Sequence, residues 1–129
     1  RVRRLFPDVR DESTRYFRKH GYCPIMHLMI FAQELVEQLP ALPKIIIDLW
    51  DEARHLTESY YEDPGYSLLL FSRDEIEKQR ELLQADPWRS GLSANRANLE
   101  DFIRYAADQG LIDEPVPVES LFHESVLDT

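Results

Sequence analysis

The chain has 129 residues, of which 43% are hydrophobic and 30% are charged, and its formal net charge is −9. This length and composition are typical of one globular domain, and no apolar run approaches the roughly 20 residues that a membrane span needs. The acidic balance argues against nucleic acid as the main partner. Cys23 is the single cysteine, which excludes an internal disulfide and fits a reducing compartment.

Charge is unevenly distributed along the chain. Residues 1–20 carry seven basic side chains against three acidic ones, a net charge of +4, and the remainder carries −13. This basic head either faces an anionic ligand or pairs with the acidic body. Pairing is the simpler explanation for most of its arginines, because charge clusters usually form solvated faces.

The first predicted helix begins at Asp11, as its N-cap, and ends at Lys19, with Gly21 as the stop signal. The run GYCPIMHLMIF over 21–31 follows. A short apolar run after a turn signal predicts a strand buried on both faces. His27 is its polar exception, and is either a core histidine bonded to a backbone carbonyl or a residue offered to a ligand.

Four further helices are predicted, with spans of 32–39, about 43–62, 73–84 and 94–108. Apolar residues at helical spacing give the second of them an inner face, formed by Ile46, Leu49, Trp50, Ala53, Leu56 and Tyr60. Asp63-Pro64-Gly65 should end that helix, and Ser72 with Glu75 resembles a capping box for the next.

The last helix has the stripe Leu99, Phe102, Ile103 and Ala106, with Gly110 as its stop and Leu111 as a hydrophobic closure. The run 66–71 fits a strand or a helical segment equally well. A single turn is expected over 119–122. Because one or two strands cannot make a stable sheet, the chain is either an essentially helical domain or part of something larger.

Chemical motifs are sparse. The four histidines show no zinc-ligand spacing, and the four glycines form no phosphate loop. Cys23 is best explained as a small buried hydrophobe, and Trp88 as a core residue first and a pocket wall second. No metal site is expected, and the pattern indicates no particular cofactor.

Three segments together resemble one family. GYCPIMHLMI is similar to its G-[IY]-x-P-I-M-H segment, and DPWRSGLSANRANLEDFIRYAADQGL is similar to D-x-W-x-x-G-L-x-x-N-R-x-x-L-E-x-F-x-R-Y-x-x-x-Q-G-L. VRRLFPD and ESLF match the flanks, and about 35–83 match loosely. These are the 4,5-dihydroxyphthalate decarboxylase-like proteins. The chain departs from them at Cys23, Leu28 and Met29, and has Phe31-Ala32-Gln33 where basic residues are common.

The resemblance implies an α/β, helix-rich chain that is the C-terminal portion of a two-lobed periplasmic-binding-protein-like (type II) fold. Residues 1–20 would end the second lobe, 21–31 would be a strand crossing to the first lobe, and 32–129 would be helices cladding that lobe. The N-terminal part of the full protein would then lie outside this chain.

The implied function is non-oxidative decarboxylation of a dihydroxylated phthalate in aromatic degradation, which would make the protein a lyase of the cytoplasm. Such a reaction needs a proton donor to the ring carbon and a cation for the retained carboxylate, for which arginine is suited. By resemblance, His27 is the catalytic donor or orients the ligand, Arg4 is the carboxylate clamp and Tyr22 lines the substrate site.

Two alternatives remain open at this point. A solute-binding receptor of an ABC transporter, with the same fold but no turnover, would bind a small anionic ligand through His27 and Arg4 and lie in the periplasm. A complete small helical protein that binds a partner would instead melt cooperatively on its own. The sequence assigns no oligomeric state.

Overall fold

A computed structural model describes residues 2–63, 65–66 and 68–129 of the chain. Its elements are α1 (Val9–His20), α2 (Gln33–Gln38), α3 (Leu42–Glu62), α4 (Ser72–Leu83), α5 (Leu92–Asp108) and two short 3-10 turns, η1 (Val118–Leu121) and η2 (Glu124–Val126). The prediction of a helix-rich chain is therefore confirmed. The lobe assignments of 1–20, 21–31 and 32–129 stay predictions.

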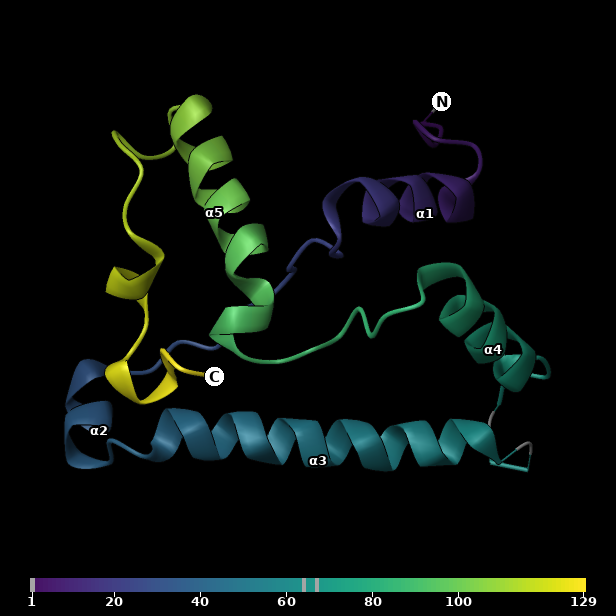
Figure 1. Cartoon of the computed structure of the whole chain (residues 1–129), viewed down its shortest axis with the longest axis horizontal. Coiled ribbons are helices and arrows are strands. Elements are labelled where there is room, and N and C mark those ends of the chain that lie inside the picture. The colour runs from purple at the N-terminus through teal and green to yellow at the C-terminus, as the bar shows by residue number, and fades with distance from the viewer. Residues whose placement is uncertain (1, 64, 67) are drawn as a thin grey trace.

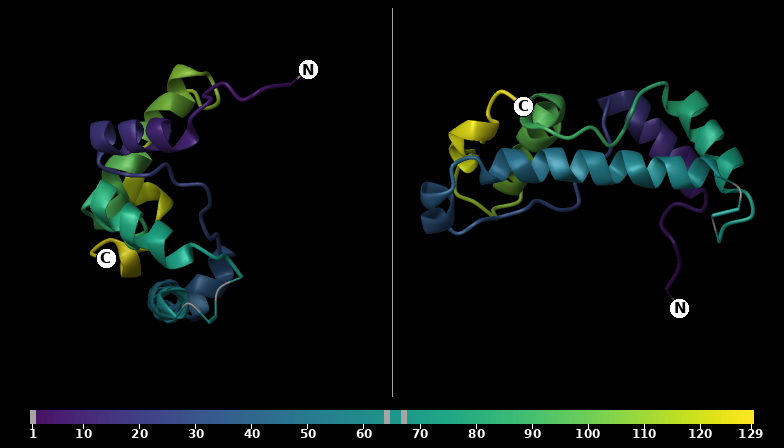
Figure 2. Two further views of the ribbon diagram at one scale, coloured as in Figure 1. Left: turned by 90° about the vertical axis from the view of Figure 1, so that its right-hand side faces the viewer. Right: turned by 90° about the horizontal axis from the view of Figure 1, so that it is seen from below.

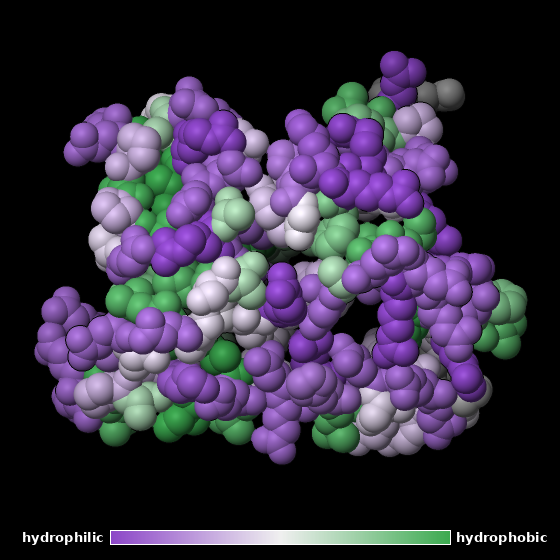
Figure 3. All heavy atoms as spheres, viewed as in Figure 1, coloured by the Kyte–Doolittle hydropathy of each residue, from purple (hydrophilic) through white to green (hydrophobic). Residues whose placement is uncertain are grey.

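The helices lie in an open arrangement around α3. Figure 1 shows α3 along one side, with α4 at its C-terminal end, α5 rising near its N-terminal half and α1 beyond α4. Contacts join α1 to α4, α3 to α4 and η2, and α5 to η1. The space-filling view has an opening between α3 and the α1–α4 side of the molecule (Figure 3).

Two of the predicted helix starts differ from the structure: the N-cap of α1 is shifted, and the capping box of α4 is not formed. Asp8, not Asp11, is the N-cap of α1, and its carboxylate accepts the backbone N–H of Asp11 at 3.0 Å. Helix α4 has Phe71 as its N-cap without a side-chain capping bond, so the predicted Ser72–Glu75 capping box is wrong. Ser72 is instead a buried residue of the first turn.

The ends of α1, α3 and α5 agree with the predicted stops. Gly21 ends α1 with φ of 79°, a left-handed conformation that favours glycine. After α5, the N–H of Leu111 bonds to the Ala106 carbonyl and that of Gly110 to the Ala107 carbonyl, which is a Schellman motif. Helix α3 ends before Asp63; Pro64 of the predicted turn lies outside the described residues.

The predicted strand at 21–31 is not formed, and the prediction of burial there is wrong. Across the described ranges no residue is in a strand, and the backbone of 26–31 makes no hydrogen bond with any described residue. A strand needs a neighbouring ladder to exist, and this part of the chain supplies none. Met26, Met29 and Ile30 are consequently exposed. The described residues of 66–71 form turns rather than a strand or a helix.

The core is small and lies on one side of α5. Its buried residues are Leu92, Leu99, Ile103 and Val118, with Ile25, Phe122 and Leu127 packed against them. The predicted inner face of α3 lies outside this core: Leu49, Trp50 and Leu56 are all more than half exposed. Although α4 and η2 contact α3, these apolar side chains stay exposed. Within the described ranges, no helix is long and apolar enough to span a membrane.

Candidate functional site

The candidate site is built where the chain leaves α1 and crosses α5. The left-handed turn at Gly21 ends α1, because its N–H bonds to the Phe17 carbonyl at 2.7 Å. The next residue, Tyr22, is thereby directed at α5. Its hydroxyl donates a hydrogen bond to a carboxylate oxygen of Asp101. Residues far apart in sequence therefore meet at this junction.

Asp101 is the centre of a polar and aromatic cluster. Its second oxygen accepts a hydrogen bond from Arg104, and the Nδ1 atom of His20 lies 3.8 Å from the oxygen that Tyr22 contacts. The His20 ring stacks on Tyr16 with the centroids 4.3 Å apart. This arrangement links the end of α1 to the outer part of α5.

The pKa values of Tyr22 and Asp101, the two partners of this hydrogen bond, are shifted in opposite directions. Burial, followed by the hydrogen bond to Asp101, raises the pKa of Tyr22 above its ordinary value of 10.0. The hydrogen bond from Tyr22, followed by that from Arg104, lowers the pKa of Asp101. Tyr22 therefore stays a neutral donor and Asp101 an ionised acceptor at neutral pH.

Asn98, one turn before Asp101 on α5, fixes the next residues of the crossing segment. Its side chain is part of a residue only 6% exposed. The amide nitrogen donates to the Cys23 carbonyl at 2.7 Å, and the amide oxygen accepts the N–H of Ile25 at 3.4 Å. Cys23 is only half-buried beside this contact, not buried as predicted, and its partial burial raises the pKa of its thiol.

The three residues proposed from sequence occupy different surroundings. Tyr22 is held on α5, whereas His27 is exposed on the unpaired part of the crossing segment. Arg4 is exposed on the N-terminal arm, which projects away from the helices (Figure 2). Since α1 lies between Arg4 and Tyr22, and its 12 residues rise by roughly 18 Å, the described structure does not bring the three together.

Arg4 lines a shallow hollow of about 430 Å³ whose other walls are Leu5, Phe6, Val9, Glu12 and Ser13. Three of these walls are apolar, and the guanidinium is the one cationic group among them. A shallow hollow with apolar walls and one cation offers complementary groups to the ring and the carboxylate of an aromatic acid, although the Glu12 carboxylate, which pairs with Arg15, belongs to the same lining.

A second hollow, of about 390 Å³, lies between α1 and α4. Besides Asp11, Thr14 and Leu82, three of its six lining residues are arginines. Two of these are neutralised, since Arg10 pairs with Glu75 at 2.5 Å and Arg15 with Glu12 at 2.5 Å. The prediction that arginines of the basic head pair with the acidic body is therefore confirmed for Arg10, whereas Arg15 pairs with Glu12 inside the head itself. Arg18 adds a further cation to the same hollow.

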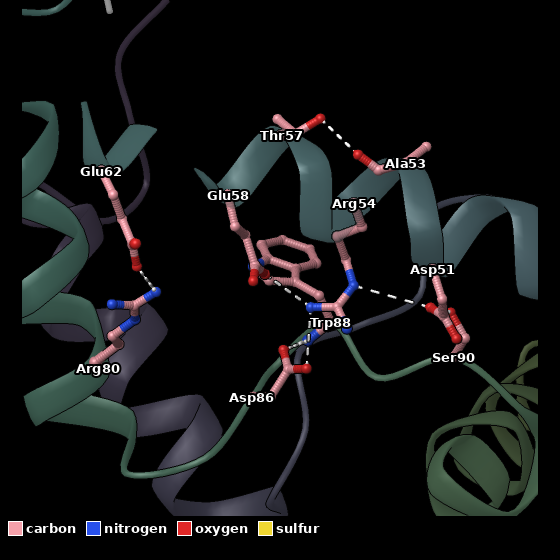
Figure 4. Close-up of polar contacts among 10 residues, drawn as sticks. All are labelled: Asp51, Ala53, Arg54, Thr57, Glu58, Glu62, Arg80, Asp86, Trp88 and Ser90. Atoms are coloured by element: carbon pink, nitrogen blue, oxygen red, sulfur yellow. Dashed lines mark hydrogen bonds and ion pairs between the residues drawn. The ribbon is translucent and has the colours of Figure 1, made fainter. Parts of the chain in front are cut away.

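A separate polar cluster attaches the α4–α5 loop to α3 (Figure 4). Arg54 of α3 lies 2.8 Å from Glu58 and 3.1 Å from Asp86, and its Nε is 3.9 Å from Asp51. Ser90 donates to Asp51 at 2.7 Å. Trp88 lies beside Arg54 in the close-up but is 58% exposed, so the predicted core role of this indole is wrong. The cluster is a structural clamp.

Sequence reasoning missed Asn98 and Asp101 as parts of the site. Asn98 directly precedes Leu99 of the predicted stripe, and a polar residue adjoining an apolar face is a signal for a buried side-chain contact. Asp101 and Arg104 are three residues apart, which indicates only a helix-surface pair. No group of three or more His, Cys, Asp or Glu residues in the described chain could hold a metal ion.

Comparison with known proteins gives one informative match. No family model matches the chain. The chain is 24% identical over 130 aligned residues to a protein named 4,5-dihydroxyphthalate decarboxylase from Comamonas testosteroni. The match covers 99% of this chain but 39% of that relative. The chain is thus helix-rich, and its distant sequence similarity covers less than half of the length of that relative.

Proposed function

We propose that the chain is part of a decarboxylase that removes one carboxylate from a dihydroxylated phthalate. The observation that carries this proposal is the match along 99% of the chain to the Comamonas testosteroni protein. The structure adds support of a general kind. The exposed faces of α3 and of the segment 26–30 are apolar surfaces of the sort that a further part of a longer protein covers.

The proposed chemistry is a proton-for-carbon-dioxide exchange at the ring. A donor gives a proton to the ring carbon that carries the departing carboxylate, and the bond between that carbon and the carboxylate then breaks. Its electron pair returns to the ring, carbon dioxide leaves, and the donor recovers a proton from water. The product is a dihydroxybenzoate. We propose His27 as the donor, since imidazole is the side chain that most often serves as a general acid or base in enzymes.

Arg4 is proposed as the clamp on the retained carboxylate. Its hollow combines a guanidinium with the apolar walls Leu5, Phe6 and Val9, which suits an aromatic carboxylate. This role requires the N-terminal arm, which lines its hollow together with Val9, Glu12 and Ser13 of α1, to leave α1 and approach His27 when the ligand binds. Tyr22 is proposed to contact the same ligand through its ring, since its hydroxyl already donates a hydrogen bond to Asp101.

The test is carbon dioxide release from 4,5-dihydroxyphthalate by the protein that the natural gene encodes, with His27→Ala and Arg4→Ala compared. We expect His27→Ala to lower kcat and Arg4→Ala chiefly to raise KM, because the clamp acts on the bound carboxylate in both ground and transition states. Tight binding of the diacid without carbon dioxide release would support the solute-receptor alternative instead.

A further inference from the structure

The buried amide of Asn98 is placed to control the segment that carries His27. Asn98 is 6% exposed, and its donor and acceptor both bind backbone groups of that segment, on Cys23 and Ile25. An amide is the side-chain group that offers a donor and an acceptor side by side. The amide nitrogen must therefore face the Cys23 carbonyl, and the amide oxygen must face the Ile25 N–H. A carboxylate in place of the amide would bring an oxygen against the Cys23 carbonyl oxygen.

The two contacts lie on either side of Pro24. Proline has no N–H to donate and a fixed φ, and Asn98 binds the Cys23 carbonyl before it and the Ile25 N–H after it. Asn98 supplies the donor and the acceptor that a neighbouring strand would otherwise supply. Beyond Ile25, the backbone of 26–31 makes no hydrogen bond with any described residue.

The hydrogen bond between Asn98 and the Ile25 N–H is consequently the last one that holds the backbone before His27, which lies two residues after Ile25. The hydrogen bond from Tyr22 to Asp101 and the packing of Ile25 against the core fix the same stretch from its two ends. Asn95, another amide of α5, binds elsewhere: it donates to the carbonyls of Arg89 and Gly91.

We propose that Asn98 is a positioning residue that sets where the His27 imidazole lies relative to the substrate ring. The inference rests on the proposed role of His27 in decarboxylation. A shift of about 1 Å in a reacting group lowers a rate by as much as 100-fold, so the amide acts on the chemical step without touching the substrate.

The experiment compares Asn98→Asp with Asn95→Asp in the protein that the natural gene encodes. Both variants remove an amide donor from α5, but only the first acts on the crossing segment. For Asn98→Asp we expect kcat for carbon dioxide release to fall roughly 10- to 100-fold with KM changed less than about threefold. The NMR signals of the His27 ring, recorded with isotope-labelled histidine and no substrate, should move. Neither change is expected for Asn95→Asp.

Asn98→Ser is the second variant, because it removes the amide without burying a charge and tests the idea where Asn98→Asp fails to fold. The proposal is overturned if kcat falls equally in the Asn95 variant, or if the His27 signals do not move in either Asn98 variant. Absence of carbon dioxide release by the unmodified protein counts against the proposed function alone. The His27 signals then still decide whether Asn98 positions that residue.

Discussion

The hydroxyl of Tyr22 donates a hydrogen bond to the carboxylate of Asp101, a residue 79 positions further along the chain. This bond joins the turn after α1 to the C-terminal half of α5. Replacing Tyr22 with Phe keeps the ring and removes the donor. We expect the free energy of unfolding to fall by about 1 kcal/mol, a typical net contribution for one hydrogen bond, in urea denaturation at pH 7. An unchanged midpoint would contradict the structure at this junction.

Asp101 should also contribute to the pH dependence of stability. Its pKa in the folded protein lies below the ordinary value of 3.8, so the unfolded chain binds its proton first as pH falls. The stabilisation is therefore complete above about pH 4 and is lost as the pH falls through the folded pKa. Unfolding of the unmodified protein and of Asp101→Asn, measured between pH 6 and pH 2, should differ at the upper end and converge at the lower.

Arg54 and Arg80 form a matched pair for testing the clamp on the α4–α5 loop (Figure 4). The Arg54 side chain is 18% exposed among three carboxylates, whereas Arg80 is 57% exposed against Glu62. Arg54→Met leaves those carboxylates without their cation, so a loss of about 1–2 kcal/mol is expected. Arg80→Met should change stability by less than about 0.5 kcal/mol. Equal effects in thermal melts would show that the clamp does not form.

Leu99 and Phe102 test where the core lies on α5. The sequence places both on one apolar stripe, but Leu99 is 6% exposed and Phe102 is 65% exposed. Leu99→Ala should cost about 2–3 kcal/mol, because it leaves a cavity among buried side chains. Phe102→Ala should cost under about 1 kcal/mol. The reverse order, measured by chemical denaturation, would mean that α5 is rotated relative to its neighbours.

Gly91 and Gly110 both have positive φ, of 92° and 69°. A Cβ on Gly91 would lie 2.7 Å from the Thr129 backbone, whereas one on Gly110 meets nothing within 4 Å. Gly110→Ala should therefore cost about 1 kcal/mol for backbone strain alone. Gly91→Ala should cost more, at least about 2 kcal/mol, because it also displaces Thr129, whose carbonyl accepts the Ser93 N–H at the start of α5. Calorimetric melting of the two variants checks this order.

Much of the local structure follows from the sequence, because helix signals are local. Gly21 and Gly110 stop their helices where predicted, and Pro43 lies in the first turn of α3. The errors are at positions where the outcome depends on distant partners. The run 24–31 has the composition of a buried strand, but a strand forms only beside another. Leu49 and Trp50 have helical spacing, yet spacing does not say what covers that face.

The site shows the same division between local and distant information. The resemblance indicates His27, Arg4 and Tyr22, but the hydrogen bonds that organise the junction come from α5, more than 70 positions away in sequence. A single sequence does not reveal such pairs, because neither Asn98 nor Asp101 differs in type from an ordinary helix-surface residue.

We propose that this chain belongs to a decarboxylase in which His27 supplies the proton to the ring carbon. The most direct measurement is carbon dioxide release from 4,5-dihydroxyphthalate, with the natural gene's protein and its His27→Ala variant prepared side by side. We expect one carbon dioxide and one dihydroxybenzoate per substrate, and a kcat at least about 100-fold lower for the variant. Binding of the diacid with no carbon dioxide released, or equal rates for the two proteins, would contradict it.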